Sequence, residues 1–426
     1  MHVAILGRQP AIGMAELECL YGSEAVRWFS DTTAVVTAPS FDFERLGGSQ
    51  KAGLVVSELA GDWRRVSQDI VRAYSAAWQG RNGKITLGIS AYGFRITARD
   101  VQKTGITLKQ KLKASGTSLR LIPNVEPALN TATSHHNKLG LSDNHIELLI
   151  VRASSGKVIV AESVGAQNIT ALAARDQARP KTDAFVGMLP PKLARMMVNM
   201  AIGSFIPTPF ADDTSRILPV SLTLSPNDSV AVGTKDKTDV DHLNSGFRIL
   251  DPFCGTGVVL QEAALLRSQA YGTDLSEKMV DYSRQNLTWL CETYRLPADI
   301  VIDQGDAMTH RWQAPITAVV AETYLGQPFS APPSSAKLVE VRGNCNHIIS
   351  EFLKNIAPQL ASGTPLCVAV PAWRDASGHV THLPFIHALS KLGYTQVPLT
   401  TVRHDQLLYY RETQVVAREL LVLRRA

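Results

Sequence analysis

The sequence predicts an α/β protein in which an α+β N-terminal region precedes a doubly wound parallel sheet with a terminal antiparallel hairpin. From residue 247 onwards, short apolar stretches alternate with helical segments, the pattern of right-handed strand–helix–strand crossovers. At about 100–200 residues per domain, 426 residues suggest two or three domains. The chain is 45% hydrophobic and 19% charged, an ordinary balance for a globular protein with sizeable cores.

The sequence carries no signal for a membrane span, a secreted fold or a structural metal. It has no run of eighteen apolar residues, and its first apolar stretch, Val3 to Leu6, is too short for a signal-peptide core. Its five cysteines are scattered without a Cys-x-x-Cys pair, which favours neither zinc nor disulfides. We therefore expect a cytoplasmic protein with no metal and no membrane partner.

The N-terminal region mixes strands and helices up to about residue 170. Strands are expected at 2–6, within 84–99, at 145–153 and at 157–165. A helix over 14–21 is expected to end at Gly22. Leu108 and Leu112 lie four residues apart among lysines, which predicts a short amphipathic basic helix over 107–116.

The middle of the chain interrupts this pattern. Two proline sites and several charges at 171–192 indicate a connector, and a helix is expected at 193–203. The polar stretch at about 205–246 is interpreted as a mobile loop or insertion. The expected parts are therefore 1–170, a connector at 171–192, and a C-terminal domain at 193–426.

The C-terminal domain begins the regular alternation. Strands are expected at 247–251, 271–275, 298–303, 317–322 and 365–370, and helices at 258–270, 276–290, near 346–358 and at 383–393. Two late strands, at 406–410 and 415–423, have no helix between them. They are expected to form an antiparallel hairpin at the edge of the sheet.

The turn after the first of these strands, Asp251-Pro-Phe-Cys-Gly-Thr-Gly257, is the main chemical signal. Its glycines allow a sharp turn and close approach to a ligand. Leu260 stands where a dinucleotide fingerprint needs a small residue. Asp274 and Asp306 end the next two strands, where carboxylates can accept ribose hydroxyls and an adenine amine. This set suits S-adenosylmethionine, and the alternative is an ordinary strand–helix unit with turn glycines. The expected cofactor-binding residues are Asp251, Phe253, Gly255, Thr256, Gly257, Asp274, Leu275, Asp306 and Ala307.

Several segments together resemble one family. DPFCGTG, GTDL and QGDA resemble the Rossmann-like class I domain of amino-methylating RNA methyltransferases. The segments at 5–22, 175–201 and 413–420 resemble the tRNA guanosine-10 N2-methyltransferase family, whose members carry an N-terminal THUMP domain. The resemblance spans nearly the whole chain except 205–246. It implies a class I methyltransferase domain preceded by a THUMP-like RNA-binding region.

The acceptor motif departs from that family. Members carry (Asp/Asn)-Pro-Pro-Tyr after the fourth strand, and this chain has Glu322-Thr323-Tyr324. By the resemblance, Glu322 and the carbonyl of Thr323 would accept the two hydrogens of the target amine, and Tyr324 would stack on the extruded base. The alternative is that Glu322 is a polar strand end and the site is altered or inactive.

Positive charge is concentrated in one block. Residues 91–200 hold 15 Lys and Arg against 7 Asp and Glu, a net of +8 in a chain whose total is +5. Such a block suggests a polyanion partner, although a solvated basic face or salt bridges between domains would also explain it. The candidate RNA-binding residues are Arg95, Lys109, Lys113, Arg175, Arg179 and Lys181.

The resemblance implies an enzyme that moves a methyl group from S-adenosylmethionine to the N2 of a guanosine in tRNA. Another amino group in tRNA or ribosomal RNA is a second hypothesis. A non-catalytic RNA-binding protein with the same fold is a third. The nucleotide position, single or double methylation, and the need for a small activating subunit are left open.

Overall fold

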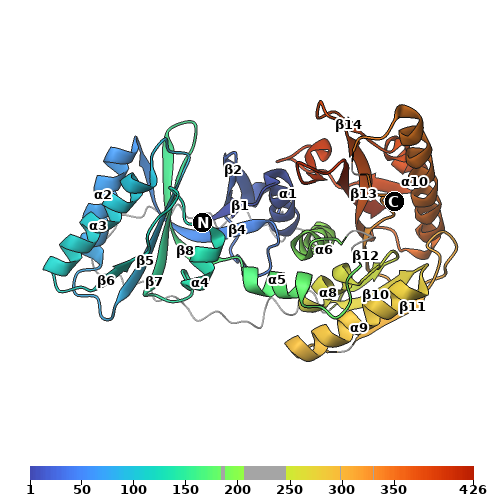
Figure 1. Cartoon of the computed structure of the whole chain (residues 1–426), viewed down its shortest axis with the longest axis horizontal. Coiled ribbons are helices and arrows are strands. Elements are labelled where there is room, and N and C mark those ends of the chain that lie inside the picture. Colours follow the sequence, from blue (N-terminus) through green and yellow to red (C-terminus); the bar gives the residue numbers. More distant parts are fainter. Residues whose placement is uncertain (184–187, 206–245, 298, 330) are drawn as a thin grey trace, which may run out of the picture.

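The computed structural model describes residues 1–183, 188–205, 246–297, 299–329 and 331–426. These residues form two sheets, one in each half of the chain (Figure 1). The polar insertion expected at 205–246 lies outside the described residues, apart from its two end positions.

The N-terminal sheet has eight strands in the order β2-β3-β1-β4-β8-β7-β5-β6. Its strands are β1 (His2–Leu6), β2 (Val26–Ser30), β3 (Thr33–Val36), β4 (Ser49–Ala60), β5 (Ile85–Tyr92), β6 (Leu119–Leu121), β7 (His145–Arg152) and β8 (Lys157–Ala166). Its helices are α1 (Pro10–Tyr21), α2 (Trp63–Ala77), α3 (Ala98–Ala114) and α4 (Thr131–His136). The expected strands at 2–6, 145–153 and 157–165 and the helix that ends before Gly22 are confirmed.

The basic helix α3 is longer than the sequence analysis predicted. Gly93, with φ +75°, follows the end of β5, and the helix begins at Ala98 rather than near 107. The backbone N–H of Thr97 donates to Asp100 Oδ2 at 2.8 Å, which caps the first turn. Val101, Leu108 and Leu112 are fully buried, so this face packs on the sheet and the lysines point outward.

The first part of the connector predicted at 171–192 is helical, which its interrupted pattern did not indicate. Helix α5 spans Ile169–Gln177, and Asn168 caps it by accepting a hydrogen bond from the Ala171 N–H at 2.9 Å. Helix α6 spans Pro191–Phe205 and so begins two residues before the expected helix.

The C-terminal sheet has the order β11-β10-β9-β12-β13-β17-β15, with β14 beside β13 and β16 beside β17. Its strands are β9 (Arg248–Asp251), β10 (Gln269–Asp274), β11 (Ile300–Gln304), β12 (Ala318–Glu322), β13 (Pro365–Arg374), β14 (Val380–Thr381), β15 (Tyr394–Gln396), β16 (Leu408–Tyr409) and β17 (Val416–Arg425). Strands β9 to β13 pair in parallel, and β17 is antiparallel to both β13 and β15. This is the expected Rossmann-like sheet.

Three details of this half differ from prediction. Besides α8 (Val258–Leu265) and α9 (Glu277–Tyr294), α10 spans Ser335–Ile356 and begins well before the expected 346. Residues 384–392 form a 3₁₀ segment with a kink at Ala388, where an α-helix was expected. The hairpin of β16 and β17 is confirmed, but β17 lies inside the sheet, because β13 pairs along one of its edges and the short strands β15 and β16 pair along the other.

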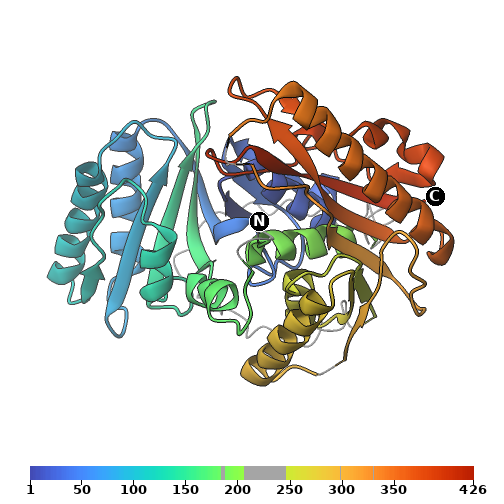
Figure 2. The ribbon, with the colours of Figure 1, turned by 45° about the vertical axis from the view of Figure 1, so that its right-hand side comes forward.

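The two halves share one hydrophobic core. A single cluster contains Leu17 of α1, Met197 of α6 and Leu420 of β17. Figures 1 and 2 show α1 beside α6 and the C-terminal strands in both views. The Glu18 carboxylate accepts hydrogen bonds from the backbone N–H groups of Thr400 and Thr401, at 2.6 and 3.0 Å. The start of the chain is therefore fastened to the C-terminal half.

This clamp gives a first prediction. Replacing Glu18 with alanine removes the acceptor of two backbone N–H groups and two threonine hydroxyls. We expect the free energy of unfolding to fall by about 1–3 kcal/mol, because those donors become unpaired and partly buried. Denaturant unfolding measures it, with the exposed Glu24 replaced by alanine as the control. Equal midpoints for the two variants would contradict the clamp.

Candidate functional site

The candidate residues meet at the carboxyl edge of the parallel strands. Asp251 ends β9, Asp274 ends β10 and Glu322 ends β12, and these three strands are neighbours in the sheet. In open α/β sheets this edge is where ligands bind. The sequence-predicted cofactor and acceptor residues are thus brought to one side of the domain.

The glycine loop between β9 and α8 is shaped by two residues with positive φ. Gly255 has φ +51° and Gly257 has φ +85°. A Cβ at Gly257 would lie 2.8 Å from the Ser283 hydroxyl, whereas one at Gly255 would meet nothing closer than 3.9 Å. Gly257 is therefore required by packing on α9, and the space over Gly255 is open to a ligand. Asn286 holds the loop by donating to the Thr256 carbonyl at 2.9 Å.

Asp274 links this loop to the end of β10. Its Oδ2 accepts from the Gly255 N–H and its Oδ1 from the Ser276 N–H, both at 2.9 Å. Burial raises the pKa of Asp274, and the two backbone N–H donors act against that rise. The next side chain, Leu275, is 69% exposed. A carboxylate with oriented oxygens and an exposed apolar side chain therefore lie together at the edge.

Asp306 and Ala307 follow β11. The Asp306 Oδ1 accepts from the Met308 N–H at 2.9 Å, which fixes its side chain in a tight turn. Ala307 is buried, and its carbonyl accepts from Asn355 of α10 at 3.1 Å. The turn after β11 is thus anchored to α10.

Asp251 is almost fully buried at the start of the loop. It is 1% exposed, and its Oδ1 accepts from the Phe253 N–H at 3.1 Å. Burial raises the pKa of Asp251 well above its usual range, and the nearby Asp274 and Glu322 add to this effect. Its neighbour Phe253 packs edge-on against Phe352. Asp251 thus shapes the loop from inside.

In the segment at 322–324, predicted to bind the acceptor, Thr323 is held by hydrogen bonds and Tyr324 is exposed. The N–H and the hydroxyl of Thr323 both donate to the Ala369 carbonyl, at 2.9 and 3.0 Å. Glu322 forms an ion pair with Arg418 of β17. Burial raises the pKa of Glu322, and Arg418 acts to lower it. Tyr324 is 42% exposed, so its ring is accessible beside the carboxylate.

Two of the predicted RNA ligands do not face solvent. Arg175 is 5% exposed and its Nε donates to Glu262 of α8 at 2.6 Å. Arg179 is 3% exposed, and its Nη2 donates a hydrogen bond to the sulfur of Met188. Arg175 therefore makes a salt bridge between α5 and α8, the alternative to phosphate binding, and neither buried arginine is accessible to a phosphate.

Lys181 lies against α9 instead of projecting freely. Its backbone N–H donates to Asn286 Oδ1 at 2.8 Å, and its carbonyl accepts a hydrogen bond from Asn286 Nδ2 at 2.9 Å. Its ammonium lies 5.4 Å from the centre of the Tyr282 ring. Because Asn286 also holds Thr256, the connector is tied directly to the glycine loop. No local sequence pattern around Asn286 predicts this role.

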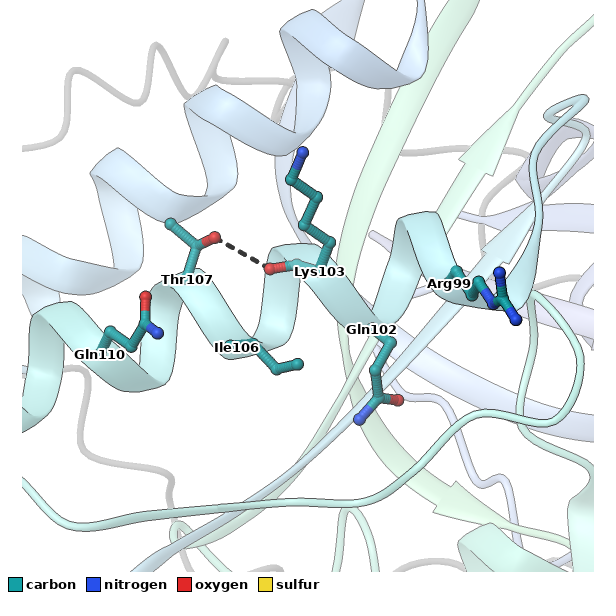
Figure 3. A pocket seen from close by; sticks show the side chains of 6 residues that line it. All are labelled: Arg99, Gln102, Lys103, Ile106, Thr107 and Gln110. Carbon is teal, nitrogen blue, oxygen red and sulfur yellow. Dashed lines mark hydrogen bonds between the residues drawn. The ribbon is translucent and has the colours of Figure 1, made fainter.

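The remaining basic candidates are exposed on the N-terminal half, as expected. Arg95, Lys109 and Lys113 are all exposed on or beside α3. The same helix lines a shallow hollow of about 420 Å³, shown in Figure 3, with the residues Arg99, Gln102, Lys103, Ile106, Thr107 and Gln110. Arg99 and Lys103 were not among the basic candidates because the helix was predicted to begin near 107, although the Thr97-x-x-Asp100 capping pattern marks its true start.

The described residues contain no group of three or more His, Cys, Asp or Glu that could hold a metal ion. Among these residues, His135 and His136 lie side by side at the end of α4 without such companions. In the same part of the chain, no helix has the length and apolar character to cross a membrane.

Comparisons with known proteins agree with this geometry. Residues 240–341 match the model of the UPF0020 family, described as an RMKL-like methyltransferase domain. A tRNA (guanine(10)-N2)-dimethyltransferase of Methanothermobacter thermautotrophicus is 28% identical over 202 residues, which cover 47% of this chain and 44% of that protein. The match thus spans less than half of the relative's length.

A solved structure shares the fold over the whole chain. The crystal structure titled TrmN, from Thermus thermophilus, aligns with a TM-score of 0.50 and 16% identity. The alignment covers 100% of this chain and 99% of that one. At this identity the likeness concerns the fold alone, and it includes the N-terminal half.

Proposed function

We propose that this chain, in which residues 240–341 match an RMKL-like methyltransferase domain, transfers a methyl group from S-adenosylmethionine to the N2 of a guanosine in tRNA. The observation that carries the proposal is the meeting of a ligand-open glycine loop, the oriented Asp274 and the Glu322 carboxylate at one sheet edge. The guanine N2 target follows the activity named for the archaeal relative. We place the reaction in the cytoplasm and keep the THUMP-like assignment of the N-terminal region within this proposal.

The residues present suit the methyl donor. Asp274 has lone pairs beyond its two backbone contacts with which to accept ribose hydroxyls. The open face of Gly255 permits close approach, and Leu275 and Phe253 offer apolar contacts beside it. Asp306 would accept a hydrogen bond from the adenine amine. S-adenosylmethionine supplies a methyl group on a sulfonium, whose carbon–sulfur bond breaks with its electron pair retained by sulfur.

Glu322, Thr323 and Tyr324 act on the acceptor. Glu322 and the Thr323 carbonyl accept hydrogen bonds from the two N–H groups of the amine, so that the nitrogen lone pair points to the methyl carbon. As the nitrogen–carbon bond forms, the nitrogen gains positive charge, which the carboxylate stabilises before the nitrogen loses a proton to it. Tyr324 stacks on the base that has left its helix.

The N-terminal half supplies the contact with the tRNA backbone. Figure 1 shows α3 at the end of the molecule opposite α10, so the exposed cations lie far from the catalytic edge. A partner that reaches both must be an extended polyanion, as a folded tRNA is. We propose Arg95, Lys109 and Lys113, together with Arg99 and Lys103, as its phosphate contacts.

Mass spectrometry of nucleosides tests the function directly. Undermodified tRNA is incubated with the protein and labelled S-adenosylmethionine, and the label is expected in N2-methylguanosine or N2,N2-dimethylguanosine. Label on another amino group would support the second hypothesis. Bound cofactor with no transfer to tRNA or ribosomal RNA would favour a non-catalytic RNA-binding protein.

A salt series tests the RNA surface in the full-length chain, since α1 shares its core with the C-terminal half. Replacing Arg95, Lys109 and Lys113 together with alanine is expected to weaken tRNA binding. The slope of log affinity against log salt should become shallower by about 2–3, because each lost phosphate contact removes about 0.7–0.9. The control is Lys354→Met on α10, whose ammonium pairs with Glu351 at the surface. An unchanged slope in the triple variant would remove α3 from the interface.

A further inference from the structure

Arg418 contacts Glu322 although its strand does not adjoin β12. Strand β13 lies between β12 and β17, and the registers align Glu322 with Ala369 and Ala369 with Leu420. Arg418 is two residues from Leu420, so it projects from the same face of the sheet as Glu322. Its guanidinium reaches across β13, and Nε donates to Glu322 Oε1.

The ion pair of Arg418 and Glu322 is largely withdrawn from water. The side chains of Arg418 and Glu322 are 8% and 17% exposed. A guanidinium stays charged even when buried, so Arg418 favours the ionised form of the carboxyl that it contacts. The other carboxyl close to Glu322 is that of Asp251, whose pKa is raised well above its usual range by burial. Burial also raises the pKa of Glu322, and the Arg418 guanidinium is the group that opposes this rise.

We propose that Arg418 is a positioning residue that keeps Glu322 a carboxylate and thereby selects a base edge with two adjacent hydrogen-bond donors. This inference rests on the proposed function. A carboxylate only accepts hydrogen bonds, and its two oxygens offer about four lone-pair sites, of which the hydrogen bond from Arg418 Nε uses one. Guanine presents the N1 hydrogen beside the N2 amine. Adenine presents an N1 lone pair beside its N6 amine, which a carboxylate repels.

The first test is the pH dependence of single-turnover methyl transfer in Arg418→Met and Arg418→Lys. Without the guanidinium, burial acts on Glu322 unopposed and its pKa rises. The active, ionised form then appears only at higher pH. We expect Arg418→Met to be about 30-fold slower than the parent at neutral pH and to recover as the pH is raised. Arg418→Lys keeps a positive charge and should stay within a few-fold of the parent.

Two controls separate positioning from a general structural effect. Lys354→Met removes a surface ion pair of the same half and should leave the profile unchanged. Affinity for S-adenosylmethionine should be the same in all variants, because the proposed cofactor contacts are at 251–275 and 306–307. A loss in Arg418→Met that is equal at every pH would overturn the proposal, as would a parent-like profile.

The second test concerns selectivity and needs only the parent and one variant. The guanosine that the parent methylates is replaced in a tRNA transcript by 2-aminopurine riboside, which keeps the 2-amino group but has a lone pair at N1. The parent is expected to methylate this tRNA about 100-fold more slowly. Glu322→Gln carries an amide that can donate to N1, so it should discriminate far less between the two.

The outcomes distinguish the inference from the function beneath it. If the parent makes no N2-methylated guanosine at any pH, the proposed function fails. If it does, but methylates 2-aminopurine equally well, the function stands and the role of the Arg418–Glu322 pair is wrong. This comparison decides the question even if Arg418→Met does not fold.

Discussion

Replacing Glu322 with alanine is expected to slow single-turnover methyl transfer to undermodified tRNA by about 10²-fold or more. That is the usual effect of deleting one preorganised polar contact in an active site. The change removes the acceptor that orients the amine, and it leaves Arg418 with a buried, unpaired charge. Affinity for S-adenosylmethionine should barely change, because its proposed contacts lie on β9, β10 and β11.

Variants of the same segment separate orientation from stacking. Glu322→Gln retains an oxygen acceptor and should keep part of the rate. Tyr324→Ala should weaken the state with the extruded base by about 1–3 kcal/mol, whereas Tyr324→Phe keeps the ring and should be mild. A Glu322→Ala enzyme as fast as the parent would show that this segment is not the acceptor site.

Replacing Asp274 with alanine is expected to weaken cofactor binding by about 1–3 kcal/mol, or roughly 5- to 150-fold in Kd. The loss has two sources. The ribose hydroxyls lose their proposed acceptor, and the N–H groups of Gly255 and Ser276 lose theirs. The glycine loop is therefore less well held before any ligand binds. Titration calorimetry with S-adenosylmethionine measures the change.

The comparison series for Asp274 uses the same measurement. Asp274→Asn keeps one side-chain oxygen for a backbone N–H and should bind more tightly than Asp274→Ala. Asp306→Ala should also weaken binding, because the adenine amine loses its acceptor. Asp281→Ala, at an exposed position of α9, should bind as the parent does. Parent-like affinity in both Asp274→Ala and Asp306→Ala would refute the cofactor assignment.

The position of the glycine loop was predictable because its signals are local. Gly255 and Gly257 stand between a strand and a helix, and Asp274 ends the next strand, so the chain order alone places them at one edge. The strands and helices of the C-terminal half follow the same logic. Their apolar periodicity is a property of each segment and does not depend on distant residues.

The parts that sequence could not provide depend on contacts between distant segments. Arg418 lies 96 residues from Glu322, and only the insertion of β17 between β13 and β15 brings the two together. The strand β15 has three residues, too few for a periodic signal. Arg175 carries the same positive charge as Lys109. Only the packing of α5 on α8 shows that Arg175 pairs with Glu262 while Lys109 remains in solvent.

The clamp between α1 and the C-terminal half sets an order of events during synthesis. Glu18 leaves the ribosome early, but its partners Thr400 and Thr401 are made more than 380 residues later. At about 5–20 residues per second, the part of α1 around Glu18 waits on the order of tens of seconds for these partners, whereas α6 is made about halfway through synthesis. An incomplete nascent chain therefore leaves the part of α1 around Glu18 exposed and prone to aggregation. Chaperones can shield this surface until synthesis is complete. Ribosome stalling before residue 400 should increase its aggregation.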